Sequence, residues 1–164
     1  MGGFKHFVLA MTASAGLTMA VAVAAAKDGF DWQGFYLGVL GGVYVEDGDV
    51  GPTISKLVGF NVVTGDLVFG AEAEALGLSW VDGDFYANLM ARARFGIVLG
   101  EDGLLYGAAG FSGWTPDFDL YPTIGGGAEL GFSETLSGRF DLQAILYGAS
   151  EVGYLVRGGI IIHP

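Results

Sequence analysis

The strongest constraint on the fold of this chain is the placement of its four arginines, each of which lies inside a segment that otherwise reads as an apolar β-strand. Around Arg92 and Arg94, leucine, alanine, phenylalanine and isoleucine occupy the alternate positions. Successive side chains of a strand point to opposite faces, so the guanidinium groups share one face and the apolar side chains share the other. The pattern predicts strands with one charged face and one apolar face.

Carboxylates inside the predicted strands follow the same alternation, because Glu72 and Glu74 alternate with alanines, and Glu129 and Asp141 each lie between apolar neighbours. A wall that is apolar outside and charged inside is suited to lipid, where a sheet must close on itself to satisfy its backbone. We therefore predict an all-β fold, an eight-stranded antiparallel up-and-down transmembrane β-barrel with short periplasmic turns. The predicted interior charge network consists of Glu72, Glu74, Arg92, Arg94, Glu129, Arg139, Asp141 and Arg157.

An eight-stranded barrel is just wide enough for side chains to fill its centre. The four arginines must then be paired, because an uncompensated buried charge costs ~3–5 kcal/mol. We expect Glu72 and Glu74 to pair across strands with Arg92 and Arg94. The network is interpreted as a structural filling, and a polar pore lining with gating charges is the alternative.

Composition agrees with a lipid-facing protein. Hydrophobic residues make up 52% of the chain and charged residues 15%, and the mean hydropathy is +0.52, which is too apolar for an ordinary soluble domain. After residue 26, no uninterrupted apolar run reaches the ~18 residues that a transmembrane helix needs. The net charge of -11 would repel nucleic acid, and the lack of cysteine excludes a disulfide scaffold.

The first 26 residues read as a cleavable secretory signal peptide, with Lys5 and His6 before an apolar stretch from Phe7 to Val23. Small residues follow at 22–26, where a signal peptidase would cut. The alternative is a retained membrane anchor. We predict export, with residues 27–164 forming the outer-membrane barrel.

Eight strand candidates follow in this region, and most approach the ~9–11 residues that cross a bilayer at a tilt. They are Gly34–Tyr44, Ser55–Val63, Leu67–Ser79, Phe85–Val98, Leu104–Gly113, Leu120–Phe132, Leu136–Gly148 and Val152–His163. Compact turns are expected at 64–66, 100–103 and 133–135, and longer or more acidic loops at 46–52, 81–84, 115–119 and 149–151. The alternation predicts short turns at the periplasmic end and acidic loops outside the cell.

Aromatic residues flank both sets of connections, as expected for two belts at the headgroup levels of a bilayer. The belt at the compact turns is predicted to contain Phe60, Phe69, Phe95, Tyr106, Phe132 and Phe140. The belt at the other rim is predicted to contain Trp80, Phe85, Tyr86, Trp114, Phe118, Tyr121, Tyr147 and Tyr154.

Several segments also resemble the small alphaproteobacterial outer-membrane β-barrel proteins, often described as porin-like or OmpA-like. The opening segment is Asp31–Gly38, and the similarity continues in order through 57–61, 69–74, 92–96, 105–110, 126–130 and 156–159. The resemblance implies an eight-stranded barrel in the outer membrane of a Gram-negative bacterium, serving envelope integrity and surface exposure. It also implies insertion by the barrel-assembly machinery. Members of that family usually end in an aromatic residue, whereas this sequence ends in Pro164, so the assembly signal is expected to be either divergent or cut short.

The acidic loops form a second candidate site. Asp47 and Asp49, like Asp82 and Asp84, flank a glycine and present hard oxygen ligands that Ca²⁺ or Mg²⁺ can use. The full spacing of a calcium-binding loop is absent. The loops are therefore interpreted as solvated, or as linked through divalent cations to the phosphates of lipopolysaccharide.

No catalytic residue and no cofactor is predicted. Barrel enzymes generally use histidine as a base, and the only histidine after residue 26 is His163. The serines at 79, 112, 137 and 150 have no evident histidine partner. Three functions remain: a structural or surface barrel, a narrow porin-like channel for ions or small solutes, and an exported soluble barrel that binds an apolar ligand. The last needs an apolar interior, which this alternation reverses.

Overall fold

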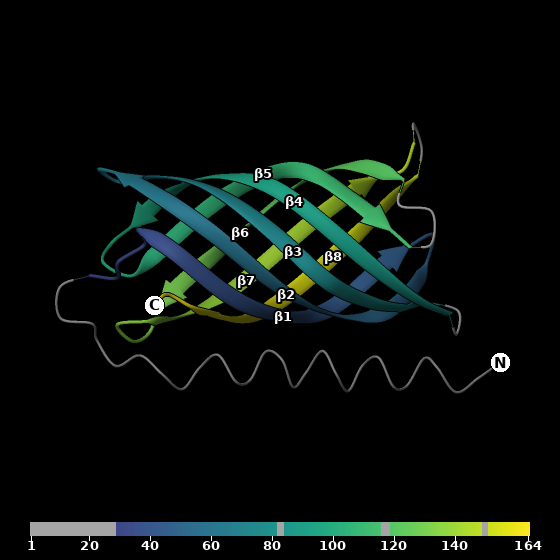
Figure 1. Cartoon of the computed structure of the whole chain (residues 1–164), viewed down its shortest axis with the longest axis horizontal. Helices are drawn as coiled ribbons and strands as arrows, with labels where there is room; N and C mark the ends of the chain where they lie inside the picture. The colour runs from purple at the N-terminus through teal and green to yellow at the C-terminus, as the bar shows by residue number, and fades with distance from the viewer. Residues whose placement is uncertain (1–28, 82–83, 116–118, 149–150) are drawn as a thin grey trace.

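The computed structural model describes residues 29–81, 84–115, 119–148 and 151–164, and these form a closed antiparallel β-barrel (Figure 1). The strands follow one another around the barrel in chain order, and β8 pairs with β1 to close it. They are β1 (Gly34–Glu46), β2 (Asp49–Thr64), β3 (Leu67–Val81), β4 (Asp84–Leu99), β5 (Gly103–Trp114), β6 (Leu120–Gly131), β7 (Leu136–Leu146) and β8 (Val152–Ile162). The predicted all-β, eight-stranded up-and-down barrel is confirmed. The described residues contain no helix long and apolar enough to span a membrane.

The connection between β1 and β2 is shorter than the sequence suggested. The loop predicted over 46–52 is wrong, because β1 runs to Glu46 and β2 starts at Asp49. The two residues between them, Asp47 and Gly48, have φ angles of 47° and 91°. Two positive φ angles in a row match the tight turn that joins twisted antiparallel strands, and Asp-Gly favours that turn. Strand β2 therefore begins before Pro52, and Pro52 pairs with Val43 of β1.

The side chains alternate between the barrel interior and the outer wall. In β2, every second residue from Gly51 to Asn61 is buried, and the residues between them are exposed. Large apolar side chains cover the outer wall, where Phe35 is 65% exposed and Leu120 is 72% exposed. Such a wall is unfavourable in water and favourable in hydrocarbon, because lipid chains cover it.

The predicted aromatic belts are only partly reproduced. At the end with the compact turns, Phe60, Phe69, Phe95 and Phe140 do lie on the outer wall. Tyr106 does not, because it shares the inward face of β5 and is buried in the interior. Its assignment to the belt is corrected. The residue lies two positions from two other inward side chains, and position along the strand fixes the face.

The belt predicted for the opposite rim needs a larger correction. Trp114, Tyr121 and Tyr147 are half-buried and pack against a cluster inside the barrel mouth. Tyr154 does lie on the outer wall, where it is 47% exposed. Trp80, Phe85, Tyr86 and Phe118 fall outside the residues whose side chains the structure describes.

The interior is filled at three levels. At the end where the chain enters and leaves the barrel, a terminal plug of apolar side chains closes it: Phe30, Trp32, Val68, Leu104 and Ala108. At the other end a loop plug closes it: Tyr44, Met90, Ile145 and Leu155, with Trp114, Tyr121 and Tyr147 against them. The charged residues lie between the two plugs. The start of β1 and the end of β8 lie at the same end of the barrel (Figure 1).

Inward-facing glycines make room for the largest interior rings. Tyr36 of β1 lies over Gly59 of β2, and a Cβ atom at Gly59 would collide with the tyrosine ring. A Cβ atom at Gly153 would likewise collide with the ring of Tyr44. A glycine opposite a ring lets the side chain lie flat against the neighbouring strand. The glycines of the strands thus contribute to packing of the narrow interior.

Candidate functional site

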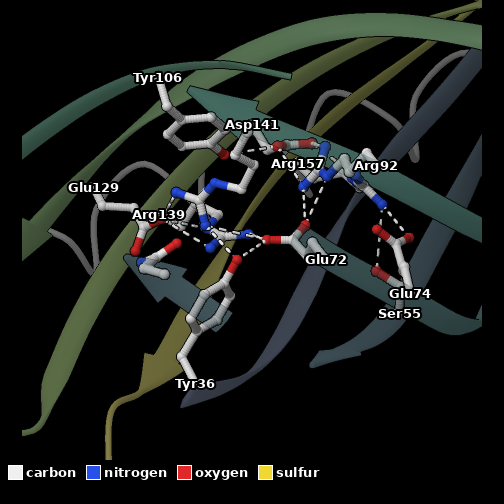
Figure 2. Close-up of polar contacts among 12 residues, drawn as sticks. Tyr36, Ser55, Glu72, Glu74, Arg92, Tyr106, Glu129, Arg139, Asp141 and Arg157 are labelled. Carbon is white, nitrogen blue, oxygen red and sulfur yellow. Dashed lines mark hydrogen bonds and ion pairs between the residues drawn. The ribbon is translucent and has the colours of Figure 1, made fainter. Parts of the chain in front are cut away.

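The structure brings all eight residues of the predicted charge network into one cluster at the centre of the barrel (Figure 2). Each residue is at most 4% exposed. Glu72 and Glu74 come from β3, Arg92 and Arg94 from β4, Glu129 from β6, Arg139 and Asp141 from β7, and Arg157 from β8. The cluster therefore joins five of the eight strands through their side chains.

Glu72 has the most partners in the cluster. One of its oxygens lies 2.6 Å from Nε of Arg92, its direct partner on β4. The other accepts hydrogen bonds from Arg139 at 2.6 Å and from Arg94 at 3.2 Å. Tyr36 donates its hydroxyl to the same oxygen at 2.8 Å. Three guanidinium groups thus share one carboxylate, so their arrangement depends on it.

Glu129 and Asp141 accept hydrogen bonds from other N–H groups of the arginines. Glu129 accepts from Arg94 at 2.6 Å and from Arg139, its direct neighbour on β7, at 2.9 Å. Asp141 accepts from its direct neighbour on β8, Arg157, at 2.7 Å, and it pairs with Arg92 at 2.9 Å. Each carboxylate therefore bridges an adjacent strand and a more distant one.

Glu74 does not pair as the sequence suggested. Its ion pair in the structure is with Arg157, which reaches it across the barrel from β8. In the ladder Glu74 faces Met90, and Arg94 faces Gly70, so the two are not cross-strand neighbours. The expected pairing of Glu74 with Arg92 or Arg94 is corrected, because a narrow interior brings non-adjacent strands within reach of long side chains.

Two tyrosines complete the network. Tyr106 donates its hydroxyl to Asp141 at 2.8 Å, and the guanidinium of Arg94 lies 3.9 Å from the centre of its ring. A cation over an aromatic face is stabilised by the ring quadrupole, most strongly where water is excluded. Sequence analysis missed Tyr36 and Tyr106 as members of the network. Both side chains face inward near the start of their strands, β1 and β5.

The positive and negative charges of the cluster are equal in number. Four guanidinium groups face four carboxylates, so the interior charges cancel. Carboxylates paired with arginine are held ionised rather than poised to donate protons. Removing one member would leave an uncompensated buried charge, at a cost of ~3–5 kcal/mol. The arrangement is that of a structural filling, which cross-links strands from the inside.

A serine and a histidine do meet at the terminal plug, which the sequence did not suggest. Ser137 Oγ lies 3.2 Å from His163 Nε2. The carboxylate of Glu129 lies 3.9 Å from the same nitrogen and accepts from Ser137 at 3.2 Å. A catalytic triad places the acid on the opposite ring nitrogen. Both Ser137 and His163 are buried, so the contact has the geometry of a packing interaction.

His163 is held neutral in this plug. Its ring packs against Phe30 and Trp32, with ring centres 4.8 Å and 5.6 Å away. Burial lowers the pKa of His163 to about 4, against the opposing effect of Glu129. The charged groups around it are Glu129, Arg139, Arg94 and Asp31. The pKa falls because desolvation disfavours the protonated ring.

The acidic turn between β1 and β2 is compact. Asp47 is a turn residue and Asp49 is the first residue of β2, and both are exposed. Asp82 lies outside the described residues, as does the side chain of Asp84, which begins β4. In the described part of the chain, no three acidic or histidine side chains are grouped as a metal ion would require. A divalent-cation site at these loops stays a prediction.

Comparisons with known proteins support the fold. The structure is similar to a de novo designed transmembrane β-barrel, with 22% identity, a TM-score of 0.53, and coverage of 80% of this chain and 97% of the design. It is similar to the N-terminal β-barrel domain of Pseudomonas aeruginosa OprF, at 12% identity and a TM-score of 0.55, covering 79% and 97%. The Yersinia pestis outer membrane protein Ail, determined in a phospholipid bilayer nanodisc, matches at 10% identity and a TM-score of 0.52, covering 79% and 99%.

No protein-family model matches the sequence, and no curated protein matches it. At these identities the structural neighbours define the fold alone. The chain has the fold of the eight-stranded transmembrane β-barrels. One of these neighbours is a design, so the fold by itself implies no particular activity.

Proposed function

We propose that this chain is a structural protein of the outer membrane of a Gram-negative bacterium, a closed barrel that contributes to envelope integrity. The apolar outer wall and the charged interior support a place in lipid. The similarity to barrels such as Ail supports the outer membrane as that place. In this proposal residues 1–26, which lie outside the described residues, form the export signal.

The observation that carries the structural role is the filling of the barrel along its axis. The terminal plug, the charge network and the loop plug follow one another from end to end. A channel needs a continuous polar path past its narrowest point. Here Arg139 and Asp141 at the centre are fully buried by their neighbours. This packing favours a structural barrel over the porin-like channel.

Membrane fractionation tests the location. Outer-membrane fractions are run in SDS gels with and without boiling, and we expect the unboiled protein to migrate faster because a folded barrel resists detergent. Extraction with carbonate should leave it in the membrane. Release by carbonate or high salt would instead identify the exported soluble barrel, and recovery in the inner membrane would contradict the proposal.

Planar-bilayer recording tests the structural role. The purified barrel should give no discrete current steps, whereas a general porin recorded in the same bilayer serves as the positive control. Reproducible steps that vanish when the protein is omitted would establish the channel alternative.

Two partners belong to this proposal. The barrel-assembly machinery would insert the chain, because a closed sheet cannot cross hydrocarbon before its edges are paired. Lipopolysaccharide would surround it, and the exposed carboxylates of Asp47 and Asp49 would contact its phosphates through divalent cations. We propose no catalytic role and no nucleic-acid partner.

A further inference from the structure

Lys56 is a cation on the outer wall of the barrel. It lies in β2 between the outward residues Ile54 and Val58, and its side chain is exposed. Its ladder partners are Val39 on β1 and Ala75 on β3. Within the described residues, the other lysine and arginine side chains are the four interior arginines. Lys56 is therefore the one basic side chain on the described outer wall.

The position of Lys56 along β2 makes its charge energetically unfavourable. It lies seven residues from Asp49 and eight from Thr64, the two ends of the strand. A lysine on the lipid face of a barrel costs ~2–4 kcal/mol near mid-depth, and less toward the interfaces. The ion pairs of the described side chains do not include Lys56. Among the described side chains, no carboxylate compensates its charge.

Two residues near Lys56 on the outer wall are small. Gly41, which is exposed on β1 and pairs with Ile54, and Ala75 on β3 are both small. The register of β3 also shifts at this level, against β2 between Ile54 and Lys56 and against β4 between Glu74 and Gly77. A bulge of this kind interrupts the ladder and redirects the wall. The lysine stem can lie along this surface and carry the ammonium toward the headgroups.

The partner is not a second copy of this chain. Within the described strands, the carboxylates away from the strand ends are the four of the interior network. The exposed acidic residues lie in turns or at strand ends, so another barrel offers no carboxylate at the depth of Lys56. The membrane itself supplies the complementary charge as phosphate. We infer that Lys56 binds the phosphate of an anionic phospholipid at the outer wall, an inference that rests on the proposed membrane location.

A comparison of two lipids tests this site. The folded full-length mature barrel, its Lys56→Leu variant and its Lys56→Arg variant are mixed in detergent micelles with phosphatidylglycerol or with phosphatidylcholine of the same acyl chains. Native mass spectrometry counts the lipids retained. Charge-assisted hydrogen bonds to phosphate are strong, so Lys56→Leu should lower retention of phosphatidylglycerol on the order of tenfold, equivalent to about 1.4 kcal/mol. Lys56→Arg should keep it, and for phosphatidylcholine the loss should be smaller, because the quaternary ammonium of that lipid offsets its phosphate.

A second measurement uses denaturant midpoints in vesicles. In phosphatidylcholine, Lys56→Leu should raise the midpoint, because it removes a charge from hydrocarbon. In phosphatidylglycerol the gain should be smaller, because the lipid compensates the wild-type charge. The difference should persist in 1 M salt, which screens contacts at the vesicle surface.

Equal gains in both lipids, or equal phosphatidylglycerol retention by wild type and Lys56→Leu, would overturn this inference while leaving the proposed function intact. A dimer that dissociates on Lys56→Leu would also overturn it, since the partner would be protein. Failure of the wild-type chain to insert into any vesicle would instead overturn the proposed function and this inference together.

Discussion

At the scale of single residues, the stability of the barrel interior depends on the pairing of buried arginines with carboxylates. The four arginines are tolerated because each meets at least one carboxylate, and the shared contacts of Glu72 bind three of them together. Buried charges of this kind add little stability beyond what well-packed apolar residues would give, but they are costly to leave unpaired. The energetic effect of a substitution therefore depends on which partner stays behind.

Arg92→Ala should lower the free energy of unfolding by about 3–5 kcal/mol, because it leaves Glu72 and Asp141 with less compensation. Combined with Glu72→Ala, it should cost less than the two single losses added together, since the pair is removed as a unit. Denaturant unfolding in detergent or vesicles measures this cycle. As a control, Glu72→Ala with Phe140→Ala on the outer wall should be additive. Strict additivity of the Arg92 and Glu72 losses would contradict the contact.

His163 predicts a pH dependence with a defined sign. Its pKa is lowered to about 4 in the folded protein, from about 6.5 in the unfolded chain. Between these values the unfolded state binds a proton that the folded state does not, so stability falls as pH is lowered from about 6.5 to about 4. The loss amounts to about 1.4 kcal/mol for each unit of separation. Unfolding midpoints measured across this range should show it.

The matched variant for this prediction is His163→Gln, which cannot titrate in this window. Its stability should vary less between pH 6.5 and 4 than that of the wild type. An identical pH profile for the two proteins would show that other groups cause the dependence.

At the scale of strands, packing between adjacent strands depends on tyrosine rings that lie against glycines. Gly59→Ala should destabilise the barrel by about 1–3 kcal/mol, because the added Cβ collides with the ring of Tyr36. Gly107→Ala is the matched control, since it faces outward and its new Cβ would lie 3.9 Å from the nearest atom, the carbonyl oxygen of Gly125. That change should stay within about 0.5 kcal/mol. Equal losses in the two variants would contradict the packing argument.

The strands were predictable from sequence wherever charge and apolar residues alternate. Arg92 and Arg94 fixed the inward face of β4, and the alternation of Glu72 and Glu74 fixed that of β3. The face of Tyr106 was not predictable in this way, because both faces of β5 carry small and apolar residues. The early start of β2 was missed because Gly51 and Pro52 resemble loop residues.

The candidate site was predictable in its members but not in its pairs. Alternation identifies which side chains point inward, so all eight charged residues followed from the sequence. The partner of Glu74 did not, because Arg157 lies 83 residues away along the chain. Phe30 and Trp32 were also missed as a plug, since they precede β1 and follow no strand period.

At the scale of the whole molecule, the network predicts cooperative unfolding. Contacts of Arg92, Arg139 and Arg157 connect β3, β4, β6, β7 and β8, so strands cannot separate singly without exposing charge. Loss of the faster-migrating gel band and the change in tryptophan fluorescence should therefore coincide on a denaturant titration. Transitions at clearly different denaturant concentrations would show that parts of the barrel open independently.

The same network constrains the order of assembly. Arg157 lies on β8, the last strand to be made, and its carboxylate partners lie on β3 and β7. A sheet that has not yet joined β8 to β1 would present Glu74 to hydrocarbon without its counter-ion. Lateral release into the bilayer is thus unfavourable before the seam between first and last strand is sealed. The charges at the centre make membrane entry conditional on closure.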